Sequence, residues 1–199
     1  MVQTQRKIGV FGGTFDPPHM AHLVIAAAAI HQLELDEVLV TVAGVPWQKV
    51  GSRRITDGWT RLRMAEVAFA SVAKTTVSDI ELTRRGNSYT IDTLEALAAD
   101  DVELFLLLGS DAAAGLDTWE RPADVAALAT IAVVPRRGHT DREVPPGFRS
   151  VDLELPGLEV SSTDIRRRVE AGEPIDGLVL PEIAAIVRDE RLYVDPDDR

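Results

Sequence analysis

Apolar residues along the chain alternate between short continuous runs and longer stretches with helical spacing. The continuous runs are rich in β-branched and aromatic residues, and they predict strands over 7–12, 37–42, 76–82, 102–108 and 131–134. The stretches with helical spacing predict helices over 20–33, 59–72, 92–99, 162–171 and 181–192. Alternating strands and helices predict an α/β protein in which a parallel sheet carries helices on both faces.

Several expected helix ends carry residues that cap helices. Thr56 or Asp57 stands where the second helix would begin. Asp92 and Glu95 have the spacing of a capping box. Gly172 follows the helix over 162–171, as expected at a helix C-terminus. These residues strengthen the helical interpretation of the segments that they bound.

Length and composition predict one globular domain over residues 1–199. Hydrophobic residues make up 45% of the chain and charged residues 27%, and there is no cysteine. No segment has the roughly 18 apolar residues of a membrane span, and the N-terminus lacks the pattern of a signal peptide. The segment PRRGHTDREVPPG, over 135–147, is the expected exposed loop. We therefore expect a cytoplasmic protein with no membrane partner.

The charge balance argues against a nucleic acid partner. Twenty-one Lys and Arg against 32 Asp and Glu give a net charge of −11, whereas proteins that bind nucleic acid usually present a basic face. Small anions remain candidates, because salt screens charges beyond about 8 Å and a bound anion responds mainly to its neighbours. The sequence leaves both a monomer and a homo-oligomer open.

The segment GGTFDPPHMAH carries the first candidate chemistry. Gly12 and Gly13 end a strand and allow a sharp turn, and His19 and His22 fall on the first turn of the next helix. Free amides and two imidazoles at a helix start favour an anion such as a phosphate. The segment matches neither the P-loop nor the dinucleotide fingerprint. Zinc binding and two solvent-exposed capping histidines are the alternatives, and zinc is disfavoured because no Cys is present.

A second candidate anion site begins at VSSTDIRRRV. Ser161, Ser162 and Thr163 open a helix whose amides and hydroxyls can hold phosphates, and Arg166 follows one turn later. Ordinary N-capping with a solvated basic face is the alternative, and it is the favoured interpretation for the two arginines that follow Arg166.

Four segments together resemble bacterial nicotinate-mononucleotide adenylyltransferases, members of the HxGH nucleotidyltransferase superfamily. They are GGTFDPPHMAH, SYTIDTL at 88–94, LLGSDAAAGLDTW at 107–119 and VSSTDIRRRV at 160–169, in the family's order. The resemblance implies a Rossmann-like nucleotidyltransferase fold. It also implies transfer of AMP from ATP to nicotinate mononucleotide, with Mg²⁺ as a cofactor held through the ATP phosphates rather than by protein ligands.

The resemblance also assigns roles to individual residues. The implied catalytic residues are His19, His22, Arg166 and Lys49. The implied ATP-binding residues are Gly12, Gly13, Thr14, Phe15, His19, His22, Asp111, Ser161, Ser162, Thr163 and Arg166. The residues implied to bind nicotinate mononucleotide are Lys49, Tyr89, Thr90 and Trp119, of which Trp119 would stack on the nicotinate ring.

Some of these assignments have structural alternatives. Asp111 would bind a ribose hydroxyl or cap a short helix, and Trp119 would stack on substrate or pack in the core. Ala21 departs from the family pattern, which has Gly between the two histidines. An extra methyl group there suits a helix but could crowd a nucleotide. The rival functions are an adenylyltransferase for another acceptor, either nicotinamide mononucleotide or phosphopantetheine, and a catalytically silent nucleotide-binding module.

Overall fold

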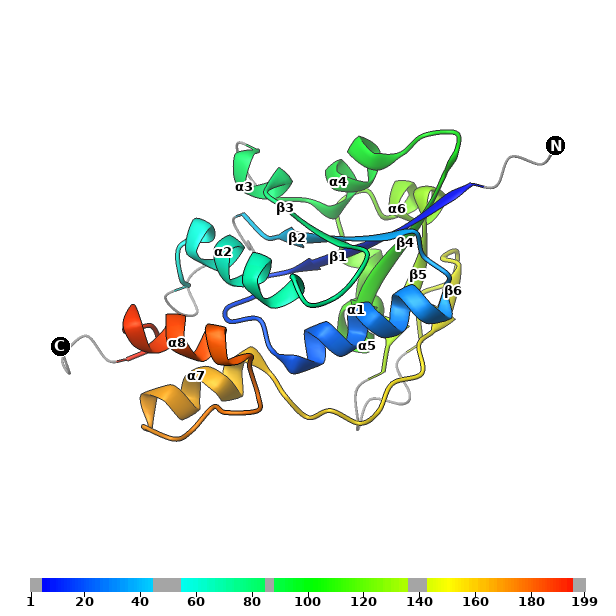
Figure 1. Cartoon of the computed structure of the whole chain (residues 1–199). Helices are drawn as coiled ribbons and strands as arrows, with labels where there is room; N and C mark the ends of the chain where they lie inside the picture. Colours follow the sequence, from blue (N-terminus) through cyan, green and yellow to red (C-terminus); the bar gives the residue numbers. More distant parts are fainter. Residues whose placement is uncertain (1–4, 45–54, 85–87, 136–142, 195–199) are drawn as a thin grey trace.

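Six parallel strands form one sheet in the order β3-β2-β1-β4-β5-β6 (Figure 1). The computed structural model describes residues 5–44, 55–84, 88–135 and 143–194. The strands are β1 (Arg6–Gly13), β2 (Glu37–Val42), β3 (Thr75–Ser78), β4 (Val102–Gly109), β5 (Ala129–Val134) and β6 (Ser150–Asp152). The expected doubly wound α/β architecture is therefore confirmed.

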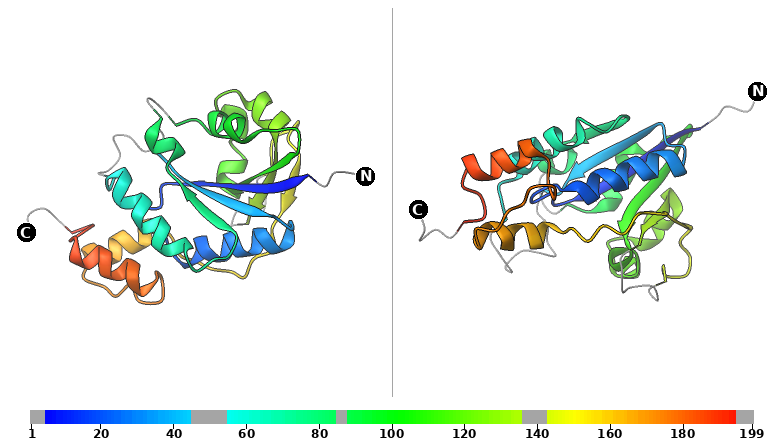
Figure 2. Two further views of the ribbon diagram at one scale, coloured as in Figure 1. Left: turned by 45° about the horizontal axis from the view of Figure 1, so that its top comes forward. Right: turned by 60° about the horizontal axis from the view of Figure 1, so that its bottom comes forward.

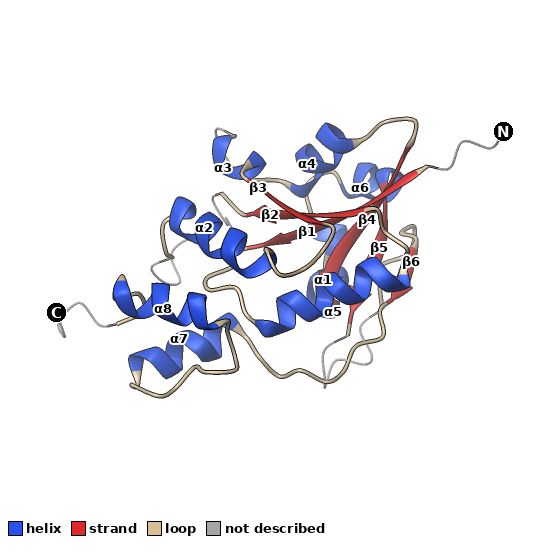
Figure 3. Cartoon of the chain, in the orientation of Figure 1, coloured by secondary structure: helices blue, strands red, loops and turns tan. Residues whose placement is uncertain are grey.

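Helices cover both faces of the sheet and give two apolar clusters (Figure 3). One face carries α1 (Met20–Gln32), α2 (Gly58–Phe69), α7 (Ser162–Glu170) and α8 (Pro181–Asp189). The other carries α4 (Thr90–Leu97), α5 (Ser110–Ala113), η2 (Leu116–Thr118) and α6 (Pro122–Leu128). A single turn, α3 (Ile80–Thr83), follows β3. Figure 2 shows α7 and α8 together beyond the carboxyl ends of the central strands.

The central strands are apolar on both sides because each side meets a helical layer. In β4, Phe105 and Leu107 belong to the cluster under α1 and α2, whereas Leu104, Leu106 and Leu108 belong to the cluster under α4. This alternation follows from the two-residue period of a strand. It explains why β4 is a continuous apolar run rather than an alternating one.

The sheet has its switch point beside β1. The chain adds β2 and β3 on one side of β1 and then crosses to add β4, β5 and β6 on the other. Ligands of such sheets bind beyond the carboxyl ends of the strands at this point. Gly13 ends β1 and Gly109 ends β4, so the sequence segments that follow both strands meet at this edge.

Two expected boundaries are wrong. The strand expected over 76–82 ends at Ser78, because the Ser78 hydroxyl accepts the Ile80 N–H and the chain turns into α3. The helix expected from Asp92 begins at Thr90 with Tyr89 as N-cap. Asp92 therefore does not cap the helix, and its carboxylate lies 3.8 Å from the Arg84 guanidinium instead.

The other expected helices form where they were expected, with ends displaced by up to three residues. Asp57 is the N-cap of α2. The sequence did not predict β6, α3, η2 or α6 as separate elements, whereas the short helix expected at Asp111 is present as α5, which begins at Ser110. Residues 136–142 of the expected exposed loop lie outside the described residues. In the part of the chain that the structure describes, no helix has the length and apolarity needed to cross a bilayer. The extent of a single domain over 1–199 and the cytoplasmic location stay predictions.

We predict that Phe69→Ala destabilises the protein by about 3–5 kcal/mol, because it empties a buried aromatic position. Phe69 is 1% exposed and makes edge-to-face contacts with Phe15 at 5.7 Å and Phe11 at 6.3 Å between ring centroids. Urea unfolding measures the change. Trp59→Ala, on the same helix but 56% exposed, is the control and should change the free energy of unfolding by less than about 0.5 kcal/mol. Equal effects of the two substitutions would contradict the packing described.

Candidate active site

The turn between β1 and α1 is built around the side chain of Phe15. Phe15 has a left-handed backbone conformation, with φ of 49°, and its buried ring packs edge-to-face on Phe11 and Phe69. A Cβ atom at Gly13 would lie 2.8 Å from that ring, so the packing requires glycine. The Phe15 side chain therefore serves the core, and only the Phe15 backbone can face a nucleotide.

Backbone carbonyls of this turn accept hydrogen bonds from three distant side chains. Arg61 Nη1 donates to the Thr14 carbonyl at 2.9 Å, and Arg166 Nη1 donates to the Asp16 carbonyl at 2.7 Å. The Ser162 hydroxyl donates to the Pro17 carbonyl at 2.8 Å. Because buried carbonyls are costly to leave unpaired, these bonds fix the path of the turn.

The Asp16 side chain is held by the end of the described chain. Asp16 is 1% exposed, and the Tyr193 hydroxyl donates to its Oδ1 at 2.9 Å. Burial raises the pKa of Tyr193 far above its usual value, and the negative charge of Asp16 raises it further. Tyr193 therefore stays protonated and keeps donating to the carboxylate over the whole working pH range.

The turn delivers His19 and His22 to one face of α1. Their rings are stacked, with centroids 3.7 Å apart and planes 21° from parallel. The His19 backbone N–H donates to His22 Nδ1 at 3.1 Å. Since Nδ1 of His22 accepts this bond, the proton of the neutral ring is on Nε2, which is left to donate.

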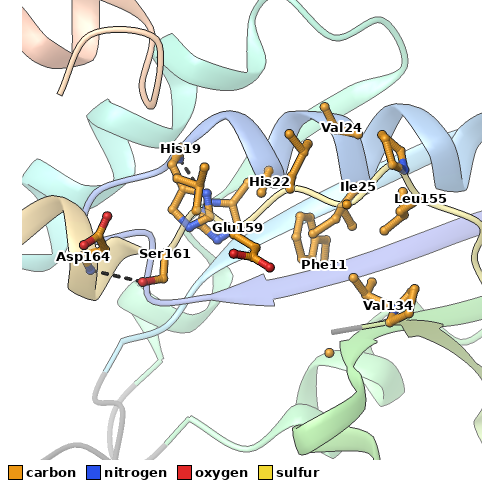
Figure 4. Close-up of a pocket in the computed structure, with 17 residues that line it drawn as sticks. Phe11, His19, His22, Val24, Ile25, Val134, Leu155, Glu159, Ser161 and Asp164 are labelled. Carbon is orange, nitrogen blue, oxygen red and sulfur yellow. Dashed lines mark hydrogen bonds between the residues drawn. The ribbon is translucent and has the colours of Figure 1, made fainter. Parts of the chain in front are cut away.

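Both histidines line a cavity of about 770 Å³ at the carboxyl edge of the sheet (Figure 4). The segment from Leu155 to Ser161 and Gly109 also line this cavity. Apolar side chains from α1, β5 and that segment line one part of the cavity, whereas His19, His22 and Glu159 gather at another (Figure 4). An apolar wall beside hydrogen-bond donors suits a ligand that joins a flat ring to phosphates.

The start of α7 lies against the same cavity. Ser161 is the N-cap, and its hydroxyl accepts the Asp164 N–H at 3.1 Å. Arg166 Nη2 also donates to the Thr163 hydroxyl at 3.0 Å. Ser162, Thr163 and Arg166 therefore bind each other or the histidine turn, and they lie where the turn and the helix N-terminus meet.

The remaining arginines of α7 form the expected solvated face. Arg167 and Arg168 each make an ion pair with Asp164 at 2.9 Å and also pair with Glu173. Hydrogen bonds from Arg168 and Arg167 lower the pKa of Asp164, so this carboxylate at the edge of the cavity stays ionised and paired.

Residues expected to bind the second substrate lie on the other side of β1. Tyr89 and Trp119 are half-buried against the cluster under α4, and Thr90 is the first residue of α4. Asp111, which is expected to bind ATP, lies on this side too, in the first turn of α5, whose N-cap is Gly109 rather than Asp111. Lys49 lies outside the described residues. The carboxyl end of β1, with Gly12 and Gly13, thus lies between the two histidines and the residues expected to bind the second substrate.

Sequence reasoning missed Arg61 and Tyr193 as residues of this site. Arg61 is 2% exposed and shares the buried face of α2 with Met64 and Ala65, so an arginine at an apolar position was the available signal. Tyr193 gave no such signal, because its partner Asp16 is 177 residues away in the sequence.

Comparisons with known proteins agree with this geometry. A family model described as cytidylyltransferase-like matches residues 10–168. A protein of Clavibacter michiganensis subsp. michiganensis, named "Probable nicotinate-nucleotide adenylyltransferase", is 40% identical over 195 residues, covering 96% of this chain and 95% of its own. A Clostridium botulinum protein of the same name is 36% identical over 197 residues, covering 94% of this chain and 98% of its own.

A solved structure shows the same fold. Plasmodium falciparum nicotinic acid mononucleotide adenylyltransferase, complexed with NaAD, matches with a TM-score of 0.80 at 18% identity, over 94% of this chain and 97% of that one. The fold and the family match together define a nucleotidyltransferase. Within the cytidylyltransferase-like family, the chain belongs to the nicotinate-nucleotide adenylyltransferases, as the four sequence segments indicated.

We predict that Tyr193→Phe destabilises the protein by about 1–3 kcal/mol, because it leaves the buried Asp16 carboxylate without this donor. The wild-type protein should also lose stability as the pH rises above about 10, since the unfolded chain then releases a tyrosine proton that the folded protein retains. Tyr193→Phe should lack that part of the alkaline loss, which urea unfolding at pH 8 to 11 measures. Parallel pH profiles for the two proteins would argue against the hydrogen bond.

Proposed function

We propose that the protein transfers AMP from ATP to nicotinate mononucleotide, forming nicotinate adenine dinucleotide and pyrophosphate. The observation that carries the proposal is the stacked pair His19 and His22 on the first turn of α1, facing the large cavity. Relatives at 36–40% identity that carry the name of this enzyme support the choice of substrates. The apolar part of the cavity is suited to the adenine ring of ATP.

In the proposed reaction, an oxygen of the mononucleotide phosphate attacks the α-phosphorus of ATP. The bond from that phosphorus to the bridging oxygen breaks, and pyrophosphate leaves with the bonding electrons. Such a reaction needs alignment and charge neutralisation more than a covalent partner. His22 would donate from Nε2 to the transferred group, and His19 would share the charge that develops on the leaving group.

The residues at the start of α7 would complete the phosphate site. Free amides at this N-terminus favour negative charge, and the Arg166 guanidinium lies one turn into the helix. Arg166 also donates to the Asp16 carbonyl, so it would bind phosphate and hold the histidine turn at once. Asp111 would bind a ribose hydroxyl of ATP.

The half-site near α4 would take nicotinate mononucleotide. Trp119 would stack on the nicotinate ring, and Thr90 with its backbone amide would receive the carboxylate. Tyr89 packs beside them against the same apolar cluster. Lys49 is proposed as a contact to the mononucleotide phosphate.

Mg²⁺ enters the proposal with ATP. It supplies positive charge to the triphosphate, and it usually binds through substrate phosphates while retaining several waters. Among the residues that the structure describes, no three His, Cys, Asp or Glu side chains are grouped as metal ligands. We propose a metal ion held by the nucleotide, and Asp164 and Glu159 are carboxylates that line the same cavity.

The direct test is pyrophosphate release from ATP and Mg²⁺ with each acceptor in turn. Nicotinate mononucleotide should support turnover, and the dinucleotide product should appear in equal amount. Nicotinamide mononucleotide and phosphopantetheine are the competing acceptors. Turnover only with one of these would replace the proposed substrate, and no turnover with any acceptor by folded protein that binds ATP would indicate a silent nucleotide-binding module.

We predict that His22→Ala lowers kcat by at least about a hundredfold, because it removes a donor that acts on charge in the transition state. Steady-state kinetics with both substrates measures the effect. His31→Ala is the matched control, since His31 lies exposed in the last turn of the same helix and should leave kcat unchanged. An unchanged kcat in His22→Ala would indicate that His22 only caps the helix and does not act in the transfer.

We also predict that Ala21→Gly lowers the stability of the protein and strengthens its binding of ATP. Ala21 lies in the first turn of α1 and lines the cavity, so glycine there costs the helix up to about 1 kcal/mol while it widens the site. Thermal unfolding and calorimetric titration with ATP check the two effects. Weaker ATP binding by the glycine variant would show that the methyl group is a contact rather than an obstruction.

A further inference from the structure

Arg61 is a buried cation that contacts the turn before the two histidines and the segment that follows β2. Its side chain rises from the first turn of α2 and donates to three backbone carbonyls in two connections of the chain, one between β1 and α1 and one between β2 and α2. Nη1 donates to Thr14 at 2.9 Å, Nε donates to Thr56 at 2.9 Å, and Nη2 donates to Gly44 at 3.4 Å. Burying a guanidinium is costly unless its N–H groups are paired, so these bonds depend on a fixed geometry of the three acceptor carbonyls.

The contacts of Arg61 continue into the half-site proposed for nicotinate mononucleotide. Thr14 lies in the turn that precedes the two histidines. Gly44 lies two residues beyond β2, and its N–H donates to the Ser88 hydroxyl at 3.3 Å. Ser88 directly precedes Tyr89 and Thr90. A path of three hydrogen bonds therefore joins the histidine turn to the start of α4: Thr14 to Arg61, Arg61 to Gly44, and Gly44 to Ser88.

The middle of this path is crowded on one side of Gly44. A Cβ atom at Gly44 would lie 2.3 Å from the Glu81 carbonyl oxygen and 2.9 Å from the Ser88 hydroxyl. Burial raises the pKa of Glu81, and the positive charges of Arg84 and Arg61 act in the opposite direction. Gly44 therefore lies close to both α3 and Ser88, so a displacement of Arg61 that moved Gly44 would also act on Ser88.

We infer that Arg61 is a positioning residue for the transfer reaction, which sets the distance and orientation of the ATP half-site relative to the acceptor half-site. The inference rests on the proposed function, because it concerns two substrates bound on the two sides of β1. Arg61 has no direct role in the chemistry. Its effect is on alignment, and a misplacement of about 1 Å between reacting groups can lower a rate by about a hundredfold.

The sharpest test uses a ligand that occupies both half-sites at once. Nicotinate adenine dinucleotide must bind to the two half-sites in their correct relative position, whereas ATP and nicotinate mononucleotide each need only one. In Arg61→Lys, which keeps the charge but loses the forked guanidinium, we expect about tenfold weaker binding of the dinucleotide and an about 10- to 100-fold lower kcat. Affinities for the single substrates should change by less than about threefold, because each half-site retains its own contacts.

Arg63→Lys is the matched control. Arg63 lies two residues along α2 but points to solvent, where it pairs with Glu190, and its replacement should change none of these quantities. Titration calorimetry gives both affinity and stoichiometry, so a smaller fraction of folded protein cannot be mistaken for a lower kcat. Ser88→Ala breaks the same path at its far end without touching the buried arginine, and it should weaken dinucleotide binding in the same selective way.

A separate readout uses chemical rescue. Arg61→Ala leaves a space shaped to the lost group, and millimolar guanidinium should restore part of its kcat while leaving Arg63→Ala unaffected. No rescue together with normal dinucleotide affinity in Arg61→Lys would overturn the inference. Equal weakening of all three ligands, or loss of the folded state in both Arg61 variants, would overturn it in favour of a purely structural role. Absence of dinucleotide formation by the wild-type protein would instead overturn the proposed function.

Discussion

The site depends on one largely buried turn whose backbone carbonyls have no hydrogen-bond donors within a strand or a helix. The turn from Thr14 to Pro18 belongs to neither β1 nor α1, so its carbonyl groups need donors from elsewhere. Arg61, Arg166 and Ser162 supply them from two different helices, and Tyr193 binds the Asp16 side chain. Each donor left without its partner would cost about 1–3 kcal/mol, so the turn and its surroundings stabilise one another.

This constraint explains how an acidic protein can present a site for anions. The net charge is −11, but the described arginines Arg61 and Arg166 donate to backbone carbonyls of the turn and so place positive charge beside it. At α7, Asp164 is paired with Arg167 and Arg168, which offsets its charge at the edge of the cavity. The histidines then need only small adjustments to meet a phosphate, because their positions are set before any ligand binds.

The sequence predicted those parts of the fold whose stability is local or periodic. β1, β2 and β4 were predicted because strands buried on both faces are apolar throughout, and α7 was predicted because Ser161 and Gly172 mark its ends. The four motifs also located the candidate site at the strand ends. The short elements α3 and α6 were missed, since helices of four and seven residues depend on packing that no local pattern records.

Individual residues also divide into those marked by a local sequence pattern and those that act on distant parts of the chain. The positions of His19 and His22 followed from their spacing at a helix start. The roles of Arg61 and Tyr193 did not, because both act on backbone or side-chain atoms far away in the sequence. Phe15 was expected beside ATP on the basis of its motif, and its ring instead lies in the core, where it sets the shape of the turn.

We propose that the fixed turn brings the two substrates together so that they react directly, with no adenylyl group carried on a histidine. The stereochemical course at the α-phosphorus tests this most directly. ATP bearing a chiral thiophosphate at the α position, turned over with nicotinate mononucleotide, should give a dinucleotide of inverted configuration, because a single in-line displacement inverts phosphorus. Retention of configuration would require two displacements and an enzyme-bound intermediate, and it would contradict direct transfer between the two substrates.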